Sequence, residues 1–326
     1  MCTDKAESPL YIGSYYNHIE VVKLLLDHKA DINRCPTNGQ SPLYIACQEN
    51  QIGVIKLLLD NKADINKCRY DGAYPLFTAC QNNLKETVKL LLESKADIEN
   101  CANNAESPLY AACQNNHIEV LKLLLDNKAD LNKCRDDGTS PFHIACYKNH
   151  INVVKLLLEN KADINKCSDG EVSPLLIACQ GNHIEVLKLL LDNKADINKC
   201  AVNGESPLYV ACNNNHIKVI NLLLENKADI NKCIDNRSSP LFIACSNNHI
   251  EVVKLLLGNQ ADINKCTHDG VSPLFEACQN NHVGVVKLLL NNKACIDKCA
   301  DDGVSPLVIA CRNYHIEVVK LLLDRQ

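Results

Sequence analysis

Apolar and polar positions follow a short helical period that recurs along the whole chain. Between residues 118 and 126 the polar side chains are Glu119, Lys122 and Asp126, and the other positions are Ile, Val or Leu. Polar residues at i, i+3 and i+7 leave only a thin strip of helix for solvent, so the apolar remainder needs cover from more than one side. The pattern predicts a short helix over about 118–126 that packs on several neighbours.

A shorter helix is predicted just before it. Ser107 can accept a bond from a free backbone N–H at a helix start, and Pro108 has no N–H to leave unpaired. This helix continues through 109–113 and ends near Asn116, because asparagine tolerates the left-handed conformation that ends helices. The stretch 130–138 predicts an extended arm with a tight turn, which joins one helix pair to the next.

The unit repeats along the entire sequence. A (Ser/Tyr)-Pro-(Leu/Phe) triplet recurs every 33 residues without insertion, with its proline at Pro9, Pro42, Pro75, Pro108, Pro141, Pro174, Pro207, Pro240, Pro273 and Pro306. One helix pair cannot bury its own apolar surface, whereas stacking on both neighbours can, and that is the physical basis of a solenoid. We therefore predict one domain over residues 1–326, built of ten stacked repeats.

Composition narrows the class of protein. Of 326 residues 46% are hydrophobic and only 4% aromatic, which suits short packed helices. The 34 basic and 39 acidic residues give a net charge of −5 and are spread along the chain, which argues against a nucleic-acid groove or a membrane-binding patch. The first residues carry neither a basic start nor an apolar stretch, so we expect no secretion signal and no membrane insertion.

Two local motifs resemble a known family. Ser140-Pro141-Phe142-His143-Ile144-Ala145 is similar to the ankyrin pattern Thr-Pro-Leu-His-x-Ala, and residues 248–257 are similar to its second pattern, Gly-His-x-x-x-Val-x-x-Leu-Leu. The chain resembles ankyrin repeats over its full length. The resemblance implies an all-α solenoid of ten stacked helix-turn-helix units with β-hairpin connections, curved so that other proteins bind on the concave side.

The chain departs from the family where helices end. In place of the usual glycine after the first helix stands asparagine in nine repeats, at Asn17, Asn50, Asn83, Asn116, Asn149, Asn182, Asn215, Asn248 and Asn281, and Tyr314 in the last. In place of the glycine after the second helix stands lysine, at Lys29, Lys62, Lys95, Lys128, Lys161, Lys194, Lys227 and Lys293, with Gln260 once. A lysine at this end of a helix is favoured by the helix dipole.

Twenty cysteines fall almost entirely into two series. One follows Ala in the first helix, at Cys47, Cys80, Cys113, Cys146, Cys179, Cys212, Cys245, Cys278 and Cys311; we interpret it as core packing. The other opens the arm, at Cys35, Cys68, Cys101, Cys134, Cys167, Cys200, Cys233, Cys266 and Cys299, with Cys2 in phase and Cys295 outside both. Equivalent cysteines lie roughly 8–10 Å apart, beyond the reach of a disulfide, so free thiols predict the cytoplasm or another reducing intracellular compartment.

Thiol chemistry is the alternative hypothesis. Cys113 and His117 have a spacing that suits zinc on a continuous helix, but Asn116 interrupts that helix. The arm cysteines could form an exposed row with metal-binding or redox activity, and Cys295 with Cys299 is its best candidate. We predict neither a bound metal nor a cofactor.

No catalytic motif appears. The sequence has no glycine-rich phosphate loop and no Gly-x-Ser-x-Gly elbow, and nearly every potential acid or base recurs as part of the repeat, so we predict no enzyme. An aromatic stripe along the first helices could stack bases, but packing between repeats is the better interpretation; it comprises Tyr11, Tyr44, Phe77, Tyr110, Tyr209, Phe242 and Phe275.

Binding residues are expected where the repeats differ from one another. After the helix cysteine the chain has Gln48, Gln81, Gln114, Tyr147, Gln180, Gln279 and Arg312, and the hairpin tips vary through Tyr70, Asp136, Val202, Arg237 and His268. Aromatic and arginine side chains anchor interfaces most often, which favours Tyr70, Tyr147, Arg237 and Arg312. We predict a monomeric scaffold for a protein partner, with a thiol or metal module and a structural spacer as alternatives. Neither end has a clearly polar capping repeat, which is compatible with a segment of a longer protein.

Overall fold

The computed structural model describes residues 7–325, and within this range the regular elements are all helices. The chain separates into two compact units, which meet at Asp169 and Gly170 and are described in turn. The all-helical class predicted from the sequence is confirmed. Cys2 lies outside the described residues, and the single domain over 1–326 stays a prediction.

The first unit contains five helix pairs. Its first helices are α1 (Pro9–Tyr15), α3 (Pro42–Gln48), α5 (Pro75–Gln81), α7 (Pro108–Gln114) and α9 (Pro141–Tyr147). Its second helices are α2 (Ile19–Asp27), α4 (Ile52–Asp60), α6 (Lys85–Glu93), α8 (Ile118–Asp126) and α10 (Ile151–Glu159), and short 3-10 turns occur at η1 (Asn103–Ala105) and η2 (Asp169–Glu171), the latter at the border of the units. The predicted boundaries of the helix over 118–126 are confirmed.

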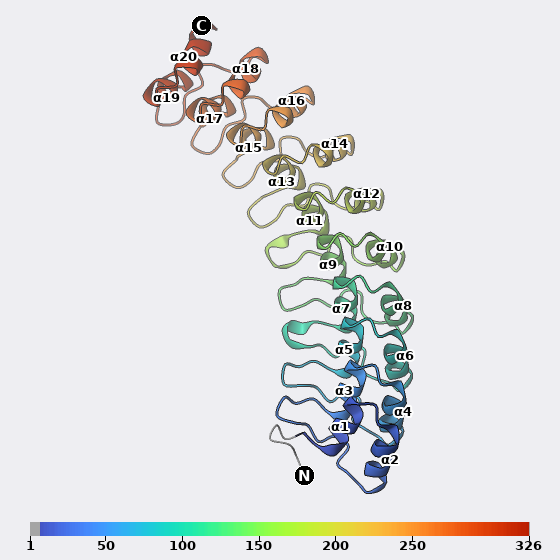
Figure 1. The fold of residues 1–326 in the computed structure, drawn as a ribbon. Coiled ribbons are helices and arrows are strands. Elements are labelled where there is room, and N and C mark those ends of the chain that lie inside the picture. The colour runs from blue at the N-terminus through green and yellow to red at the C-terminus, as the bar shows by residue number, and fades with distance from the viewer. Residues whose placement is uncertain (1–6, 326) are drawn as a thin grey trace. The chain divides into compact units, whose positions relative to one another are not determined.

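The second unit repeats the same arrangement. Its first helices are α11 (Pro174–Gln180), α13 (Pro207–Asn213), α15 (Pro240–Ser246), α17 (Pro273–Gln279) and α19 (Pro306–Arg312). Its second helices are α12 (Ile184–Asp192), α14 (Ile217–Glu225), α16 (Ile250–Gly258), α18 (Val283–Asn291) and α20 (Ile316–Leu323). Within each unit the first helices pack against one another and lie between the loops and the layer of second helices (Figure 1).

The helix starts follow the Ser-Pro signal. The Ser107 hydroxyl accepts a hydrogen bond from the Tyr110 N–H at 3.1 Å, and proline occupies the first helical position, as predicted. Helix α5 is different, because Tyr74 precedes its proline and offers no side-chain cap.

The helix ends explain both the asparagines and the lysines. Asn116 and Lys128 have φ angles of 61° and 64°, in the left-handed region where glycine is usual. Around Lys128 two backbone bonds close the helix end: its N–H reaches the carbonyl of Leu125 at 2.9 Å, and the Ala129 N–H reaches that of Leu124 at 3.0 Å. Lysine, lacking the freedom of glycine, therefore sits at a strained position in every repeat where it replaces glycine.

The core lies between the two helix layers. In α8 the side chains of Val120, Leu121 and Leu124 have no solvent exposure, and Cys113 in α7 is buried as completely. Eight of the nine helix cysteines are buried, as predicted; Cys311 is exposed instead, because no further repeat packs on α19 within residues 7–325.

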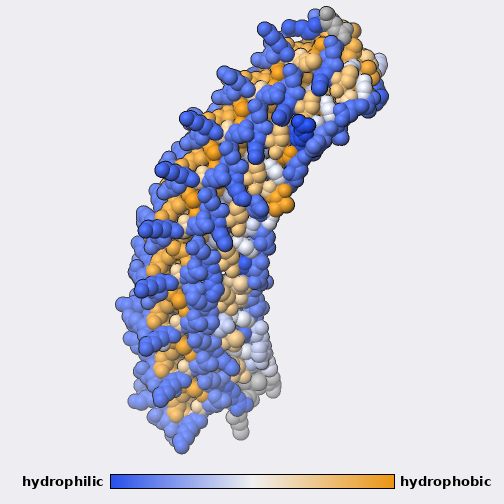
Figure 2. Space-filling view, turned by 180° about the vertical axis from the view of Figure 1, so that it is seen from behind, coloured by the Kyte–Doolittle hydropathy of each residue, from blue (hydrophilic) through white to orange (hydrophobic). Residues whose placement is uncertain are grey.

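Figure 2 shows polar side chains standing out between strips of hydrophobic residues along each unit. Helices long and apolar enough to cross a bilayer are absent from residues 7–325.

The predicted β-hairpin connections are wrong. We call the projecting loops fingers; those used below comprise 36–40, 69–73, 102–106 and 135–139 in the first unit and 201–205, 234–238, 267–271 and 300–304 in the second. In a typical finger two backbone bonds close the loop, from the Arg135 N–H to the Thr139 carbonyl and from the Gly138 N–H to the Arg135 carbonyl, each at 3.0 Å. A third bond, from the Asp136 N–H to the Asn104 carbonyl at 3.1 Å, links the finger to the preceding one. These bonds close a turn and do not continue as a ladder, so among the described residues the fingers contain turns and no strands.

Hydrogen bonds from side chains to backbone link the arms of successive repeats, which the sequence did not predict. We call this series of bonds the arm ladder. In the recurring Asp-Ile-Asn segment, the Asp64 carboxylate accepts the N–H of Asn66, and the Asn66 side-chain oxygen accepts the N–H of Asp97 in the next repeat at 3.1 Å. The same link recurs at Asn33, Asn132, Asn198, Asn231 and Asn264. In one repeat Glu99 replaces asparagine and its carboxylate accepts the Asp130 N–H at 2.8 Å, which indicates that an acceptor oxygen is what the position requires.

Replacing Asn66 with alanine should therefore destabilise the chain by about 1 kcal/mol, the typical net value of one hydrogen bond. The Asn66→Asp variant keeps the acceptor and should unfold like the parent chain. Urea unfolding followed by circular dichroism compares the three proteins, and equal loss of stability in both variants would contradict the ladder's role.

Candidate functional site

The first unit has a polar groove between its fingers and the ends of its first helices. It encloses about 410 Å³ and is lined by finger residues of 69–73 and 102–106 together with Tyr44, Gln48, Phe77, Thr78, Gln81 and Asn82. We call it the Arg69 groove. The fingers project beyond the helix ends, so side chains from three consecutive repeats meet in one depression.

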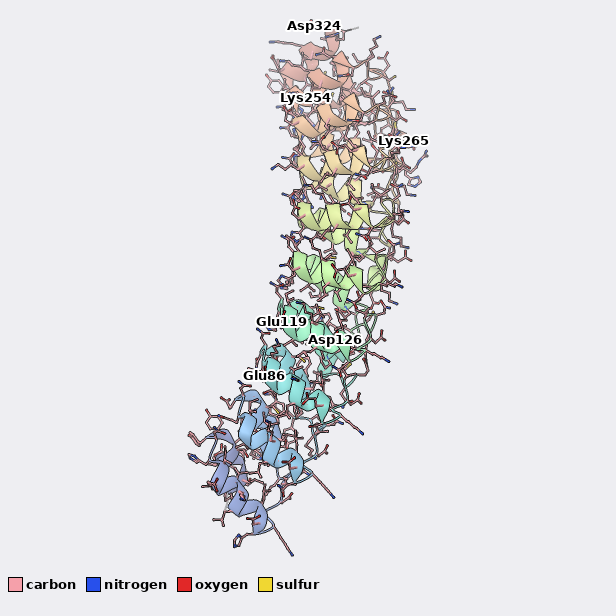
Figure 3. All side chains as sticks on the ribbon, turned by 90° about the vertical axis from the view of Figure 1, so that its right-hand side faces the viewer. Glu86, Glu119, Asp126, Lys254, Lys265 and Asp324 are labelled. Carbon is pink, nitrogen blue, oxygen red and sulfur yellow. The ribbon has the colours of Figure 1, made fainter. Side chains whose placement is uncertain are left out.

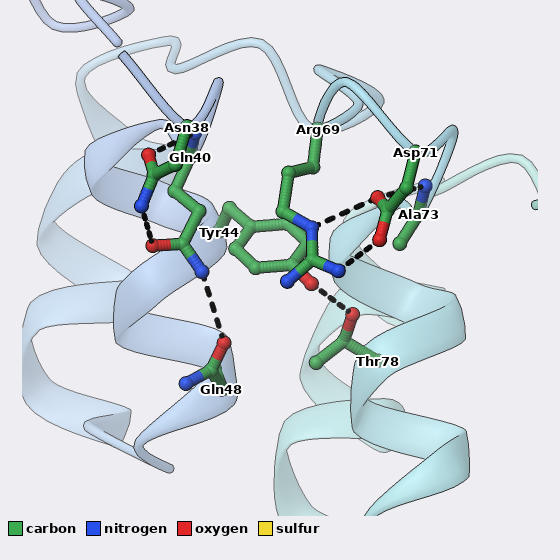
Figure 4. Close-up of polar contacts among 8 residues, drawn as sticks. All are labelled: Asn38, Gln40, Tyr44, Gln48, Arg69, Asp71, Ala73 and Thr78. Carbon is green, nitrogen blue, oxygen red and sulfur yellow. Dashed lines mark hydrogen bonds and ion pairs between the residues drawn. The ribbon is translucent and has the colours of Figure 1, made fainter. Parts of the chain in front are cut away.

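An arginine stacked on a tyrosine forms one wall of this groove (Figure 4). The guanidinium carbon of Arg69 lies 5.7 Å from the centre of the Tyr44 ring, and the guanidinium also binds both oxygens of Asp71. The Thr78 hydroxyl donates a hydrogen bond to the Tyr44 hydroxyl at 2.9 Å. Arg69 holds the pKa of the Asp71 carboxyl below its usual range, and burial raises the pKa of Tyr44.

A chain of amides behind the groove supports Gln48, which lines it. The Asn38 amide donates to the Gln40 side-chain oxygen at 2.6 Å, and the Gln40 amide donates to Gln48 at 3.2 Å (Figure 4). The Tyr11 hydroxyl donates to the same Gln40 oxygen at 2.9 Å. These hydrogen bonds fix the orientation of the Gln48 side chain at the edge of the groove.

The arginine–tyrosine pair occurs a second time in the first unit. The guanidinium carbon of Arg135 lies 5.4 Å from the centre of the Tyr110 ring, and Arg135 forms ion pairs with Glu106 and Asp137, each at 3.4 Å. Both arginines thus have carboxylate neighbours and an aromatic ring beneath them, and they give the fingers rigid, amphipathic walls.

The second unit has a groove of different character. It encloses about 420 Å³ between the fingers 267–271 and 300–304, and we call it the Asp301 groove. Phe275 and Ile309 form a buried apolar floor, and Val271 and Val304 extend it onto the fingers. Asp269, Asp301 and Asp302 line its rim, together with Gln279 and Arg312.

The repeated histidines are structural in this fold. His117 follows Cys113 by four residues, but its Nε2 lies 3.0 Å from the carbonyl oxygen of Gln81 in the preceding repeat. Equivalent bonds to the end of a preceding first helix occur at His150, His216, His249, His282 and His315. Across residues 7–325 no three His, Cys, Asp or Glu side chains converge in a way that could hold one metal ion.

Most of the described cysteines have a raised pKa. Burial raises the pKa of the helix thiols such as Cys113, and it raises that of Cys278 to about 12. Burial also raises the pKa of the half-buried arm thiols Cys101 and Cys200, and the nearby Lys133 and Lys232 oppose this shift with a smaller effect. A thiol with a raised pKa carries little thiolate, the reactive form, at neutral pH.

Buried His143 occupies the aromatic position of its repeat, where Tyr110 stands in the repeat before it. The side chain is 5% exposed, and neither ring nitrogen has a hydrogen-bond partner. Burial lowers its pKa to about 4, with Asp137 opposing the shift. The remaining aromatic stripe is buried apart from the half-buried Phe242, which agrees with packing between repeats.

The predicted binding residues fall into the two units. The Arg69 groove brings Gln48 and Gln81 together, and the Asp301 groove brings Gln279 and Arg312 together. Tyr70 lies outside both, in a pocket beside Cys35, Lys67 and Cys68. The other predicted residues stand in their own repeats: Asp136, Tyr147, Val202, Arg237, His268 and Gln180 are exposed, and Gln114 is half-buried.

Several groove residues were missed. Arg69 lines its groove, and Arg135 is its counterpart two repeats later. Their finger position is Pro, Ala, Ser, Ile or Thr in other repeats, so the expectation that binding residues differ between repeats could have found both. Asp269, Asp301 and Asp302 stand at finger positions as well and gave no separate signal in the sequence. The stacking of arginine on Tyr44 and Tyr110 could not be predicted from the sequence, because it joins side chains of neighbouring repeats.

Comparison with known proteins agrees with this architecture. A family model described as ankyrin repeats (3 copies) matches residues 1–69, 61–134, 76–168, 121–201, 166–233 and 241–326. The chain therefore belongs to the ankyrin repeat family. No curated protein matches it. Ankyrin repeats are generally protein–protein interaction modules and are typically not enzymes.

Proposed function

We propose that this chain is a scaffold that binds a partner protein on the side formed by its fingers and first helices. Its contacts would come from the grooves of each unit and from the variable residues beside them. Tyr70, Tyr147, Arg237 and Arg312 would be the principal anchors, because aromatic and arginine side chains contribute most to interface energy.

The position of exposed apolar side chains supports this choice most directly. Leaving aside the first and last repeats, the exposed large hydrophobic residues of the described chain are Tyr70, Tyr147 and Val202, which are 77%, 57% and 67% exposed. All three lie on fingers or first helices. The second helices between the end repeats instead present charged side chains such as Glu86, Glu119 and Lys254 (Figure 3). Aromatic residues are enriched in protein interfaces and charged residues are depleted from their centres, so the fingers and first helices are the better candidates for contact with a partner.

Affinity capture from a lysate tests the proposal. The Tyr70→Ala, Tyr147→Ala, Arg237→Ala and Arg312→Ala variant should lose at least tenfold of any captured partner. A matched variant with alanine at Lys56, Asp126, Lys155 and Lys218, exposed on second helices, should retain it. Equal capture by both variants would place the interface elsewhere, and no captured protein with the parent chain would contradict the scaffold function.

A further inference from the structure

Charge is divided between the two sides of the second unit. Four consecutive finger and first-helix segments, 201–214, 234–247, 267–280 and 300–313, hold six acidic and two basic residues. The three intervening segments of second helix and arm, 215–233, 248–266 and 281–299, hold five acidic and eight basic residues. The side that bears the groove is therefore negative although the other side is positive.

The Asp301 groove concentrates this negative charge above an apolar floor. No ion pair to Asp269, Asp301 or Asp302 occurs within the described chain. The fingers hold the rim in place: the Asp301 N–H bonds the Asp269 carbonyl at 3.0 Å, and the Asp302 carboxylate accepts the Val304 N–H at 2.9 Å. Arg312 is the one basic residue of the lining.

The geometry of these carboxylates suits several cationic side chains of a peptide better than one bound metal ion. No three of the acidic, histidine or cysteine side chains in residues 7–325 converge on a common point, which disfavours a metal ion. Asp269 and Asp302 stand 33 residues apart, at equivalent positions of neighbouring repeats, whose packed helices are roughly 8–10 Å apart. Asp301 precedes Asp302 in the same finger. A polyproline II segment rises about 3.1 Å per residue with three residues per turn, so every third side chain points the same way at about 9 Å intervals.

We infer that the Asp301 groove binds an extended, polyproline II-like segment of the partner with lysine or arginine at every third position and an aliphatic residue between them. The cations face the rim of Asp269, Asp301 and Asp302, and the aliphatic side chain covers the floor of Phe275 and Ile309. This inference rests on the proposed scaffold function and adds the chemistry of the partner. Charge complementarity sets orientation and the rate of association, and the floor adds apolar burial.

Fluorescence anisotropy with labelled synthetic peptides tests it on the full chain. A peptide of four Lys-Pro-Val repeats should bind. Its affinity should fall strongly in 0.5 M salt, because salt screens interactions between exposed charges. A peptide of the same composition with its four lysines adjacent should bind several-fold more weakly. A peptide of four Glu-Pro-Val repeats should not bind.

Variants locate the site. A variant with three substitutions, Asp269→Asn, Asp301→Asn and Asp302→Asn, should bind the Lys-Pro-Val peptide at least tenfold more weakly. Asparagine keeps the side-chain oxygen that accepts the Val304 N–H in the Asp302 turn. A matched variant with Asp192→Asn, Glu225→Gln and Asp324→Asn removes the same charge from the second helices and should bind like the parent chain. Circular dichroism melting verifies that both variants fold.

No binding of the Lys-Pro-Val peptide, equal binding of the glutamate peptide, or equal weakening in both variants would overturn the inference. Its failure is distinct from failure of the scaffold function. If lysate capture depends on Tyr70, Tyr147, Arg237 and Arg312 but the basic peptide does not bind, only the partner chemistry is wrong. If the parent chain captures no protein, the scaffold function itself fails.

Discussion

Acidification from pH 6.5 to pH 4 should destabilise the parent chain by about 3 kcal/mol more than it destabilises a His143→Leu variant. Buried His143 has a folded pKa of about 4, well below the value of an unfolded histidine, because burial disfavours its charged form. Well above pH 6.5 the ring is neutral in both states and contributes no pH dependence to the stability. As the pH falls from 6.5 towards 4, the unfolded state binds the proton first and stability is lost.

Leucine suits this test because it stands at the equivalent position, Leu176, in the next repeat. The replacement also removes two buried ring nitrogens without partners, so the variant should be more stable than the parent by about 1 kcal/mol at pH 7. Urea unfolding at pH 7, pH 6.5 and pH 4 measures both effects. The same pH dependence in parent and variant would show that His143 does not carry the predicted effect.

Glycine at three of the lysine helix ends should stabilise the chain by about 2 kcal/mol in total. Lys62, Lys95 and Lys128 have φ angles of 64° to 65°, a conformation that costs a side-chain-bearing residue roughly 1–2 kcal/mol. Part of that gain is offset, because glycine is freer in the unfolded chain and the favourable charge at the helix end is lost. The midpoint of thermal unfolding should therefore rise in the Lys62→Gly, Lys95→Gly, Lys128→Gly variant.

A matched set separates backbone conformation from charge. Lys56, Lys89 and Lys122 are exposed lysines inside the second helices of the same repeats, with ordinary helical backbone. Glycine there removes the same charge but lowers stability by about 1 kcal/mol at each position. A loss of stability in the helix-end set as well would contradict the predicted backbone strain at Lys62, Lys95 and Lys128.

Local chemistry predicted much of the fold. The Ser107-Pro108 pair marks a helix start because its capping bond forms within one turn, and Asn116 marks a helix end because its own backbone preference decides it. The 33-residue period predicted stacking, since the second helix has too little polar surface to stand alone. The lysine ends could also have been read as strained positions, because they replace a residue that the family uses for its conformational freedom.

The contacts between neighbouring repeats could not be predicted from the sequence of one repeat. The fingers resemble hairpins in sequence, yet each forms too few backbone bonds to become a strand pair. The link from Asn66 to the backbone of Asp97 joins residues 31 positions apart, and the stacking of Arg69 on Tyr44 joins neighbouring repeats. Cys311 is exposed although its sequence context equals that of the buried helix cysteines, because burial depends on the repeat that packs next to it.

By itself the sequence determined the helices, their order and their need to stack, because capping, helix termination and apolar periodicity act within one repeat. The tertiary structure decided which side chains share a groove, which of the helix cysteines remains exposed and where negative charge collects above an apolar floor. Those properties depend on the distance between residues of different repeats, which only packing sets.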